Sequence, residues 1–237
     1  MAIFKEKLNF NHVDYSGNYK LSTLFTTLAT LATQNAMEIG MWNEDMRSSY
    51  GWVVAKQTMK LEEPIRADDC IEITTCIDKG SFVTFPRNYY IRKEDKLVGT
   101  ISAIWTLIDI EKRNIVAPRR VGLIVPDIKC ELPLDTPKTV KEDMELELVS
   151  QRKVMYSDLD VNQHMNNARY LEWACDLIDI DLYRDHYIKE VSINYKKEIK
   201  PASIVNLFLG RNTDKFIIKG VVEEEVAFIL ELFFCKR

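Results

Sequence analysis

The chain has 237 residues, 46% of them hydrophobic and 29% charged, as in an ordinary globular protein long enough for a sizeable core. Its net charge of -4 argues against a nucleic-acid binder, because phosphate contacts require an excess of Lys and Arg. No apolar run could span a bilayer, and the first residues show no signal or transit pattern, so we expect a cytoplasmic protein without membrane insertion.

In the first half, apolar residues recur at helical spacing from Leu24 to Leu31, which predicts a helix that Ser22 or Thr23 caps and Gly40 ends. Strand-like runs rich in β-branched and aromatic residues follow at 52–61, 71–77, 82–92 and 97–109. Pro64 ends the first of these runs.

Four of the seven prolines fall in a polar stretch, which predicts an irregular connector. The second half then repeats the pattern: a strand-like run at 145–155, a helix that begins at Asn166 or Asn167, and further runs at 191–199, 204–209, 216–222 and 226–234. Pro201 follows the run at 191–199. We expect an N-terminal repeat at 1–126, a linker at 127–143 and a C-terminal repeat at 144–237.

Helix, strand, proline and a meander of long strands thus occur twice, which predicts a duplicated α+β unit. The strand connections are too short for parallel crossovers, so the sheet should be antiparallel. One helix cannot cover several long strands. We therefore expect the two sheets to join into one long curved sheet around two central helices.

The five cysteines, Cys70, Cys76, Cys130, Cys175 and Cys235, are widely scattered. They form no C-x-x-C motif and no Cys/His cluster, so neither a disulfide framework nor a zinc site is indicated. We expect all five to be small buried side chains in a reducing compartment, and we expect no cofactor.

The densest polar cluster is the run 157–167, Ser-Asp-Leu-Asp-Val-Asn-Gln-His-Met-Asn-Asn, directly before the second predicted helix. Carboxylate, amide and imidazole groups together can orient a water, move a proton and hydrogen-bond a carbonyl. Backbone N–H groups near Asn166 and Asn167 could hold an oxyanion at the helix start. The cluster therefore suits attack of water on an acyl group.

Two other readings of this run fail. A calcium loop starting at Asp158 would need glycine at Gln163 and glutamate at Arg169. A thiol nucleophile would have to be Cys175, which lies about three helical turns beyond His164. The chain also has no G-x-S-x-G, Gly-rich phosphate or H-E-x-x-H motif, which disfavours serine hydrolases, nucleotide enzymes and zinc proteases.

Together with Tyr170-Leu-Glu-Trp173, Asn194-Tyr-Lys-Lys-Glu198, Gly51-Trp-Val-Val54 and Ile104-Trp105, the run resembles the acyl-acyl carrier protein thioesterases of plant plastids and bacteria. The resemblance covers nearly the whole chain in the same order. It implies a double hotdog fold, in which each repeat wraps a central helix. The catalytic set that it implies is Asp160, Asn162, His164 and Glu198. Many family members have a cysteine where this chain has Ile199.

Glu198 is the weakest member on the residues alone. Alternation in 191–199 groups it with polar residues such as Ser192 and Asn194, as at a solvated strand end. The resemblance favours a functional role. Aligning Pro64 with Pro201 puts Leu61 in the place of Glu198 in the first half, which leaves that half free to hold substrate.

The resemblance implies hydrolysis of fatty acyl-acyl carrier protein (acyl-ACP) thioesters, with acyl carrier protein as the partner. We assign Glu198 as general base, with His164 sharing proton handling, Asp160 fixing the arrangement and Asn162 positioning the thioester. An acyl-CoA hydrolase of the same fold and a non-catalytic acyl-binding protein are the alternatives. Chain length and a homodimer stay open.

Two further sets of residues belong to this hypothesis. Side chains expected near an apolar slot for the acyl chain are Met37, Met41, Trp42, Met59 and Trp105. Groups expected to dock the acidic carrier are, first, Lys196, Lys197 and Lys200 and, second, Lys112, Arg113, Arg119 and Arg120.

Overall fold

In the computed structural model, which describes residues 2–126, 128, 130 and 132–237, the strands form one antiparallel sheet. Its order is β1-β3-β4-β5-β2-β8-β11-β10-β9-β7, and the short β6 pairs with β5. The strands are β1 (Ile3–Lys7), β2 (Tyr50–Leu61), β3 (Cys70–Ile77), β4 (Phe85–Lys93), β5 (Lys96–Asp109), β6 (Asn114–Ile115), β7 (Glu147–Lys153), β8 (His186–Tyr195), β9 (Ile204–Arg211), β10 (Lys215–Val222) and β11 (Glu225–Lys236).

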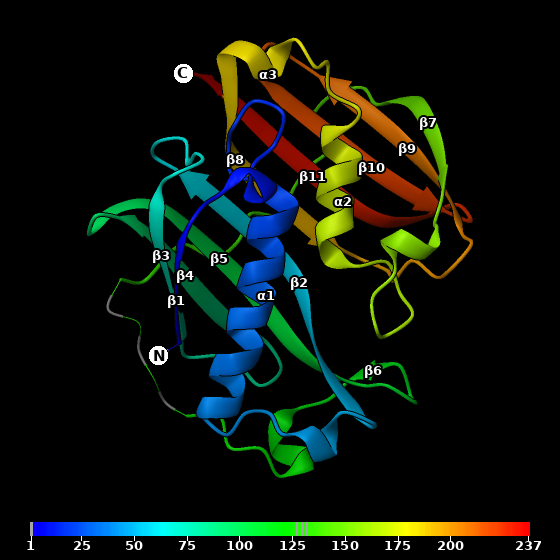
Figure 1. The fold of residues 1–237 in the computed structure, drawn as a ribbon. Coiled ribbons are helices and arrows are strands. Elements are labelled where there is room, and N and C mark those ends of the chain that lie inside the picture. Colours follow the sequence, from blue (N-terminus) through cyan, green and yellow to red (C-terminus); the bar gives the residue numbers. More distant parts are fainter. Residues whose placement is uncertain (1, 127, 129, 131) are drawn as a thin grey trace.

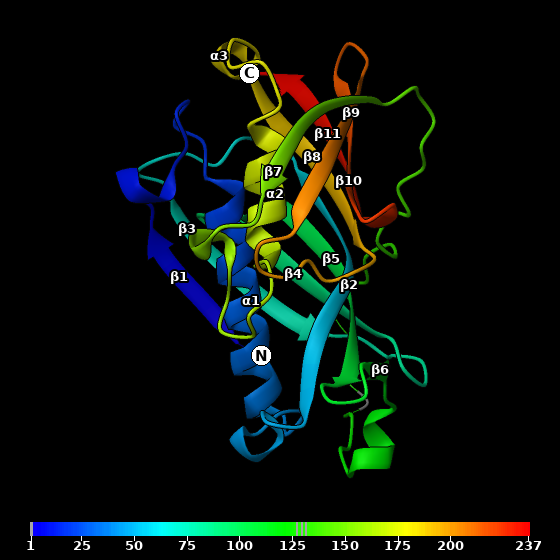
Figure 2. The same ribbon diagram turned by 90° about the vertical axis from the view of Figure 1, so that its right-hand side faces the viewer.

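Two helices, α1 (Leu21–Glu38) and α2 (Asn167–Cys175), lie side by side against one face of the sheet (Figure 1). The view turned by 90° shows that the sheet curves around them (Figure 2). A single turn, α3 (Leu182–Asp185), precedes β8. The predicted α+β double hotdog is therefore confirmed. None of the helices in the described residues has the length and apolar character needed to cross a bilayer.

The helix ends follow the sequence in part. Lys20 is the N-cap of α1 and makes no side-chain capping bond, so the predicted caps Ser22 and Thr23 are wrong and lie inside the first turn. Gly40 has a φ of 73° just after the helix, as predicted for a C-terminal glycine. Asn166 caps α2 as predicted, because its side chain accepts a hydrogen bond from the helix backbone (2.9 Å).

The strand that precedes Glu198 differs most from its prediction. The run 191–199 was expected, but β8 begins at His186 and ends at Tyr195. The N–H groups of Lys196 and Lys197 both donate to the carbonyl of Ala227 (2.8 and 3.0 Å), which ends the regular ladder. Glu198 therefore lies beyond the strand, and strand alternation does not decide where its side chain points.

The two halves join where β2 pairs with β8. The register places Thr58 opposite Ser192, and their hydroxyls share a buried hydrogen bond of 3.0 Å. The order β1-β3-β4-β5-β2 on one side matches β7-β9-β10-β11-β8 on the other. An approximate two-fold relation thus passes through the Thr58–Ser192 pair.

The core lies between the inner face of the sheet and the two helices. Its side chains come from both halves, and many of them are at most 1% exposed. Examples from the helices and from both central strands are Leu24, Leu28, Leu31, Met59, Leu171, Ala174, Val191 and Ile193. Both helices pack into this one core, and the two halves therefore form one body.

The described part of the connector crosses the outer face of the sheet at this seam. Lys138 N–H donates to the Thr58 hydroxyl (2.9 Å), and Asn194 bonds both the Lys138 carbonyl and the Val140 N–H (each 2.9 Å). Glu231 of β11, which is 1% exposed, accepts from the Lys138 ammonium. Of the predicted linker 127–143, residues 127, 129 and 131 lie outside the described residues, and the boundaries stay a prediction.

The cysteines depart from expectation. Cys76 at the end of β3 and Cys130 in the connector form a disulfide, with Cα atoms 5.9 Å apart. The expectation of five unpaired thiols is therefore wrong for this pair. It is also wrong for Cys70, which is exposed rather than buried. A separation of 54 residues and the lack of a motif hide such a pairing from sequence reasoning.

Asn194 provides a test of how the connector is held. Asn194→Ala would leave a carbonyl and an N–H of the connector without partners, each costing about 1–3 kcal/mol where buried. We expect the free energy of unfolding, measured in urea, to fall by roughly 2–4 kcal/mol. The matched control Asn206→Ala loses only an exposed bond from Gln151 (2.7 Å), so its change should stay within about 0.5 kcal/mol. Equal losses in the two variants would contradict this role.

Candidate active site

The loop before α2 is a tight turn that presents His164. Asp160 N–H donates to the His164 carbonyl (2.9 Å), and Gln163 N–H donates to the Asp160 carbonyl (3.0 Å). Gln163 has a φ of 62°, the left-handed conformation that closes such a turn. Leu159 and Met165 bridge the two arms. Backbone hydrogen bonds therefore hold the main chain at His164 in place.

Asp158 anchors this turn to the helix, a role that the sequence did not reveal. Its carboxylate is 8% exposed and accepts from Met155 N–H (2.9 Å) and from the Trp173 indole N–H (3.3 Å). An aspartate before a helix usually reads as a solvent-facing cap. The pairing with a tryptophan on the helix itself could be suspected only from the Trp in the neighbouring motif.

Glu198 is brought to the turn by its neighbour in the chain. The Ile199 carbonyl accepts from Met165 N–H (2.9 Å), which ties the segment after β8 to the turn. The Glu198 Oε2 atom then lies 3.4 Å from His164 Nε2. The side chains of His164 and Glu198 are 22% and 35% exposed, so both can reach solvent or substrate. Ile199 points the other way and is buried in the core.

Arg113, from the turn between β5 and β6, also reaches this carboxylate. Its Nη2 atom donates to Glu198 Oε2, the same oxygen that lies beside His164. The sequence placed Arg113 in a docking group only, because nothing in the linear order connects residue 113 with residue 198. The candidate site therefore includes a side chain from the first half of the chain.

Asp160 and Asn162 have other contacts. Asp160 Oδ1 accepts from Asn162 N–H (2.8 Å), as in an Asx turn. In the described residues, neither side chain hydrogen-bonds His164 or Glu198. The structure thus joins His164 with Glu198, while Asp160 fixes the turn and the Asn162 side chain is exposed.

The expected oxyanion donors are only half available. Asn166 N–H is already used, since it donates to the Asp158 carbonyl (2.8 Å). The expectation for Asn166 is therefore wrong. Asn167 is the first residue of α2, where helix geometry leaves the backbone N–H without an intrahelical acceptor. Asn167 N–H is the donor of this end that remains for a developing negative charge.

Aromatic rings form an apolar wall behind the pair. Tyr170 of α2 packs edge-on against Tyr195 (5.3 Å between centroids) and Phe228 (4.9 Å). Burial raises the pKa of the Tyr170 phenol, and the nearby Glu198 and Asp160 carboxylates raise it further. Tyr170 is thus a neutral neighbour of the site.

Cys175 cannot serve as the nucleophile. It lies at the end of α2, whereas His164 precedes the start of that helix. Burial raises the pKa of its thiol to about 12, so the reactive thiolate is scarce at neutral pH. The described residues contain no group of three or more His, Cys, Asp or Glu that could hold a metal ion.

The first half contains the same turn without the same chemistry. Asp14 N–H donates to the Asn18 carbonyl (2.8 Å), Gly17 N–H to the Asp14 carbonyl (3.0 Å), and Ser16 N–H to Asp14 Oδ1 (2.9 Å). These bonds repeat those of the turn before α2 one for one. Asn18 therefore occupies the place of His164.

The partner segment repeats as well. The Ile65 carbonyl accepts from Tyr19 N–H (2.6 Å), as the Ile199 carbonyl does after the other turn. Ile65 thus corresponds to Ile199, and Pro64 occupies the place of Glu198. The first half has neither the imidazole nor the carboxylate at this position.

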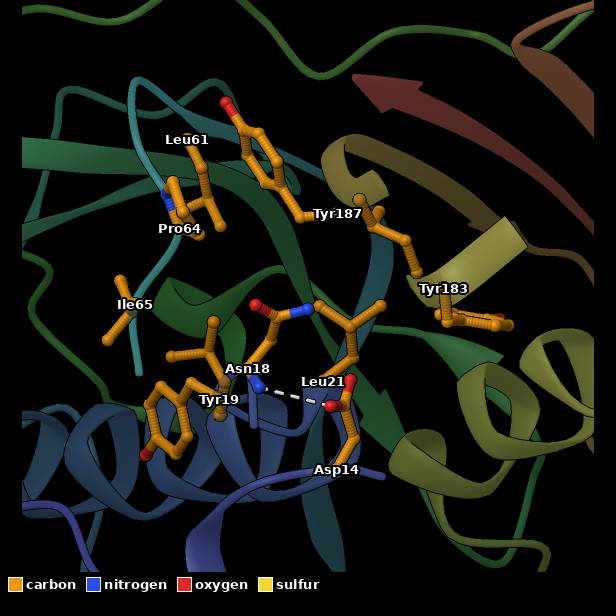
Figure 3. Close-up of a pocket in the computed structure, with 11 residues that line it drawn as sticks. Asp14, Asn18, Tyr19, Leu21, Leu61, Pro64, Ile65, Tyr183 and Tyr187 are labelled. Atoms are coloured by element: carbon orange, nitrogen blue, oxygen red, sulfur yellow. Dashed lines mark hydrogen bonds between the residues drawn. The ribbon is translucent and has the colours of Figure 1, made fainter. Parts of the chain in front are cut away.

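The predicted correspondence of Leu61 with Glu198 is wrong, because the hydrogen bonds, and not the prolines, define the equivalent positions. Figure 3 shows this counterpart, where Asn18 and Pro64 line a cavity of about 30 Å³. That volume holds little more than a water or two. Tyr187 at the start of β8 also lines this cavity, so the cavity lies at the opposite end of the strand from Glu198.

A larger hollow of about 500 Å³ lies between the start of α1, α2 and the segment after α2, with Lys20, Leu171 and Ile180 in its lining. Neither His164 nor Glu198 lines either hollow. The same holds for the five side chains expected at an acyl slot: Met37, Met41, Trp42, Met59 and Trp105. Met59 and Met41 are fully packed, and the acyl slot stays a prediction.

Known proteins resemble this chain in sequence. Residues 3–120 match the acyl-ACP thioesterase N-terminal domain and residues 141–226 match the C-terminal domain. The chloroplastic oleoyl-acyl carrier protein thioesterase 2 of Arabidopsis thaliana is 22% identical over 70% of this chain and 49% of its own length. The chain thus spans about half the length of such plant relatives.

Solved structures give the same picture of the fold. An acyl-ACP thioesterase from Bacteroides thetaiotaomicron superposes with a TM-score of 0.87 at 22% identity, covering 98% of this chain and 97% of the other. The 12:0-ACP thioesterase from Umbellularia californica superposes with a TM-score of 0.78 at 14% identity, covering 99% and 98%. With both halves matched in order, the chain belongs to the acyl-ACP thioesterase family.

Proposed function

We propose that the protein hydrolyses fatty acyl-ACP thioesters to free fatty acid and carrier protein, which ends fatty acid synthesis. The observation that carries the proposal is the His164–Glu198 pair, 3.4 Å apart at the start of α2. Membership of the acyl-ACP thioesterase family supports the substrate class. The set Asp160, Asn162, His164 and Glu198 is proposed as the catalytic machinery.

In the proposed mechanism, a water oxygen attacks the carbonyl carbon of the thioester. Its proton passes to Glu198, and His164 orients the water and relays protons. Asn167 N–H stabilises the oxyanion, and the exposed Asn162 amide positions the thioester. The C–S bond then breaks, and the carrier thiolate takes up a proton. Asp160 keeps the turn in shape through its bond to Asn162 N–H (2.8 Å).

The division of labour between the halves is part of the proposal. The ionisable pair lies in the C-terminal repeat, while the equivalent turn of the N-terminal repeat carries Asn18 and Pro64. The first repeat is thus free to bind the acyl chain. A cytoplasmic location and a homodimer stay predictions.

An acyl-CoA thioesterase and a non-catalytic acyl-binding protein remain the rivals. The purified protein should release fatty acid from acyl-ACP substrates with a higher kcat/KM than from acyl-CoA of the same chain length. Higher kcat/KM with acyl-CoA would assign the first rival. Tight acyl binding without release from either substrate would assign the second.

His164→Ala and Glu198→Ala should each lower kcat by roughly two to four powers of ten, the usual span for a general acid or base. Both side chains are partly exposed, so the thermal unfolding temperature should change little. The matched control is His12→Ala, since His12 Nε2 also lies near a glutamate, Glu6 (3.5 Å), but outside the site. Near-normal turnover in either variant would remove that residue from the mechanism.

Thiol alkylation of the native protein should leave hydrolysis largely unchanged. Burial raises the pKa of the partly buried Cys175 thiol to about 12, and Ile199 replaces the cysteine of relatives. Exposed Cys70 should react instead, as peptide mass mapping would reveal. Stoichiometric inactivation traced to Cys175 would revive a thiol nucleophile.

Carrier docking should depend on Lys196 and Lys200, which flank Glu198 and are exposed. Lys197 between them pairs with Glu225 and is less available. Lys196→Glu with Lys200→Glu should raise KM for acyl-ACP and leave a short carrier-free thioester unaffected, because only the carrier brings a large acidic surface.

The matched control is Lys189→Glu with Lys236→Glu, which makes the same charge change at the opposite end of β8. Added salt should weaken the wild-type reaction mainly with acyl-ACP. Loss on both substrates would mean that the lysines serve the site itself. No loss on either would move the docking surface elsewhere.

A further inference from the structure

Arg113 sits in a well-defined turn of the first half of the chain. Asp109 at the end of β5 organises this turn, since its side chain accepts from Lys112 N–H (2.8 Å) and its carbonyl from Arg113 N–H (2.9 Å). The bond from Lys112 holds the pKa of Asp109 below its usual value, which keeps the carboxylate charged. Arg113 itself has a φ of 56°, a left-handed conformation that non-glycine residues adopt only where the turn imposes it.

From this turn the guanidinium crosses to the other half of the chain. Arg113 Nη2 donates to Glu198 Oε2, and the same oxygen lies 3.4 Å from His164 Nε2. The guanidinium and the imidazole thus both approach Oε2, and Oε1 has no partner in the described residues. Because Arg113 holds Oε2, the direction in which Oε1 points is fixed as well.

The contact is poorly explained as a stabilising ion pair. The Arg113 and Glu198 side chains are 45% and 35% exposed, and pairs of such exposure add little to folding stability because water screens them. Lys112 beside it takes a different partner, Asp109 (3.3 Å), so the turn does not need Arg113 for its own charge balance.

We propose that Arg113 is a positioning residue of the active site, which orients the Glu198 carboxylate so that Oε1 can accept the proton of the attacking water. The site is then built from both repeats, and the first repeat contributes to the chemistry as well as to substrate binding. This inference rests on the proposed hydrolysis. It replaces the earlier view of Arg113 as a docking group.

A guanidinium suits the task better than an ammonium. Its planar set of N–H donors fixes the orientation of a carboxylate, whereas a lysine provides a point charge on a flexible stem. Arg113→Lys should therefore restore the charge without the geometry, and its activity should fall between those of the wild type and Arg113→Gln.

The first test compares Arg113→Gln with Lys112→Gln on a short carrier-free thioester. Both variants lose one positive charge from the same turn, but only Arg113 touches Glu198. We expect Arg113→Gln to lower kcat by about tenfold to a hundredfold through misplacement of the base, with little change in KM. Lys112→Gln should match the wild type. Equal kcat in all three proteins, or equal losses in the two variants, would overturn the inference.

A second measurement needs no substrate. The chain has three histidines, so the ring signals of His164 can be followed by NMR at a fixed pH. The imidazole and the Arg113 guanidinium approach the same oxygen of Glu198. Arg113→Gln releases that oxygen and lets the carboxylate turn, so the ring signals of His164 should shift, while Lys112→Gln should leave them in place.

This measurement separates the inference from the proposed function. If the wild type hydrolyses no thioester, the proposed function fails, yet the His164 signals still decide whether Arg113 acts on the pair. If the wild type is active but the His164 signals are the same in Arg113→Gln, the inference fails and the proposed function stands.

Discussion

The structure depends on the pairing of β2 with β8. Each half alone has a meander whose innermost strand would be an open edge, with unpaired backbone groups and a half-covered helix. The pairing of β2 with β8 closes both edges at once, and the hydrogen bond of 3.0 Å between the Thr58 and Ser192 hydroxyls lies at its centre. The connector then uses the Thr58 hydroxyl and the Asn194 amide of the same two strands as its own attachment points. One seam therefore serves the sheet, the shared core and the crossing chain.

The site depends on this seam because it brings the ends of three separate segments together. β8 leads to Glu198, β5 on the other side of β2 leads to Arg113, and the turn before α2 supplies His164. None of these side chains is deeply buried, yet each is fixed by backbone bonds: Met165 N–H to Ile199, Arg113 N–H to Asp109, and Asp160 N–H to His164. Rigid backbone with partly exposed polar side chains is what a site needs if it is to meet water and substrate without losing its geometry.

Sequence reasoning reached the fold because the duplication repeats helix, strand and proline signals in one order, and hydrophobic periodicity decides such elements locally. The polar run before the second helix pointed to His164, whose catalytic role stays a prediction, and to Asn166 as the helix cap. Glu198 needed the family resemblance, since β8 ends at Tyr195 and alternation no longer applies. Arg113, the Asp158–Trp173 bond and the Cys76–Cys130 disulfide are contacts between distant segments. No local pattern encodes them. The alignment of Pro64 with Pro201 was wrong because prolines mark the ends of strands only to within a few residues.

The matching turns at Asp14–Asn18 and Asp160–His164 have a consequence for how such a protein can change over time. In a dimer of identical repeats, every substitution appears twice, so a residue that loses its reactivity is lost from both positions. Fusion of the repeats into one polypeptide removes that restriction. Asn18 and Pro64 could replace an imidazole and a carboxylate in one half while the other half kept both. The genetic linkage of two once-equivalent units thus allows them to specialise separately, and the imidazole and carboxylate remain at one of the two turns.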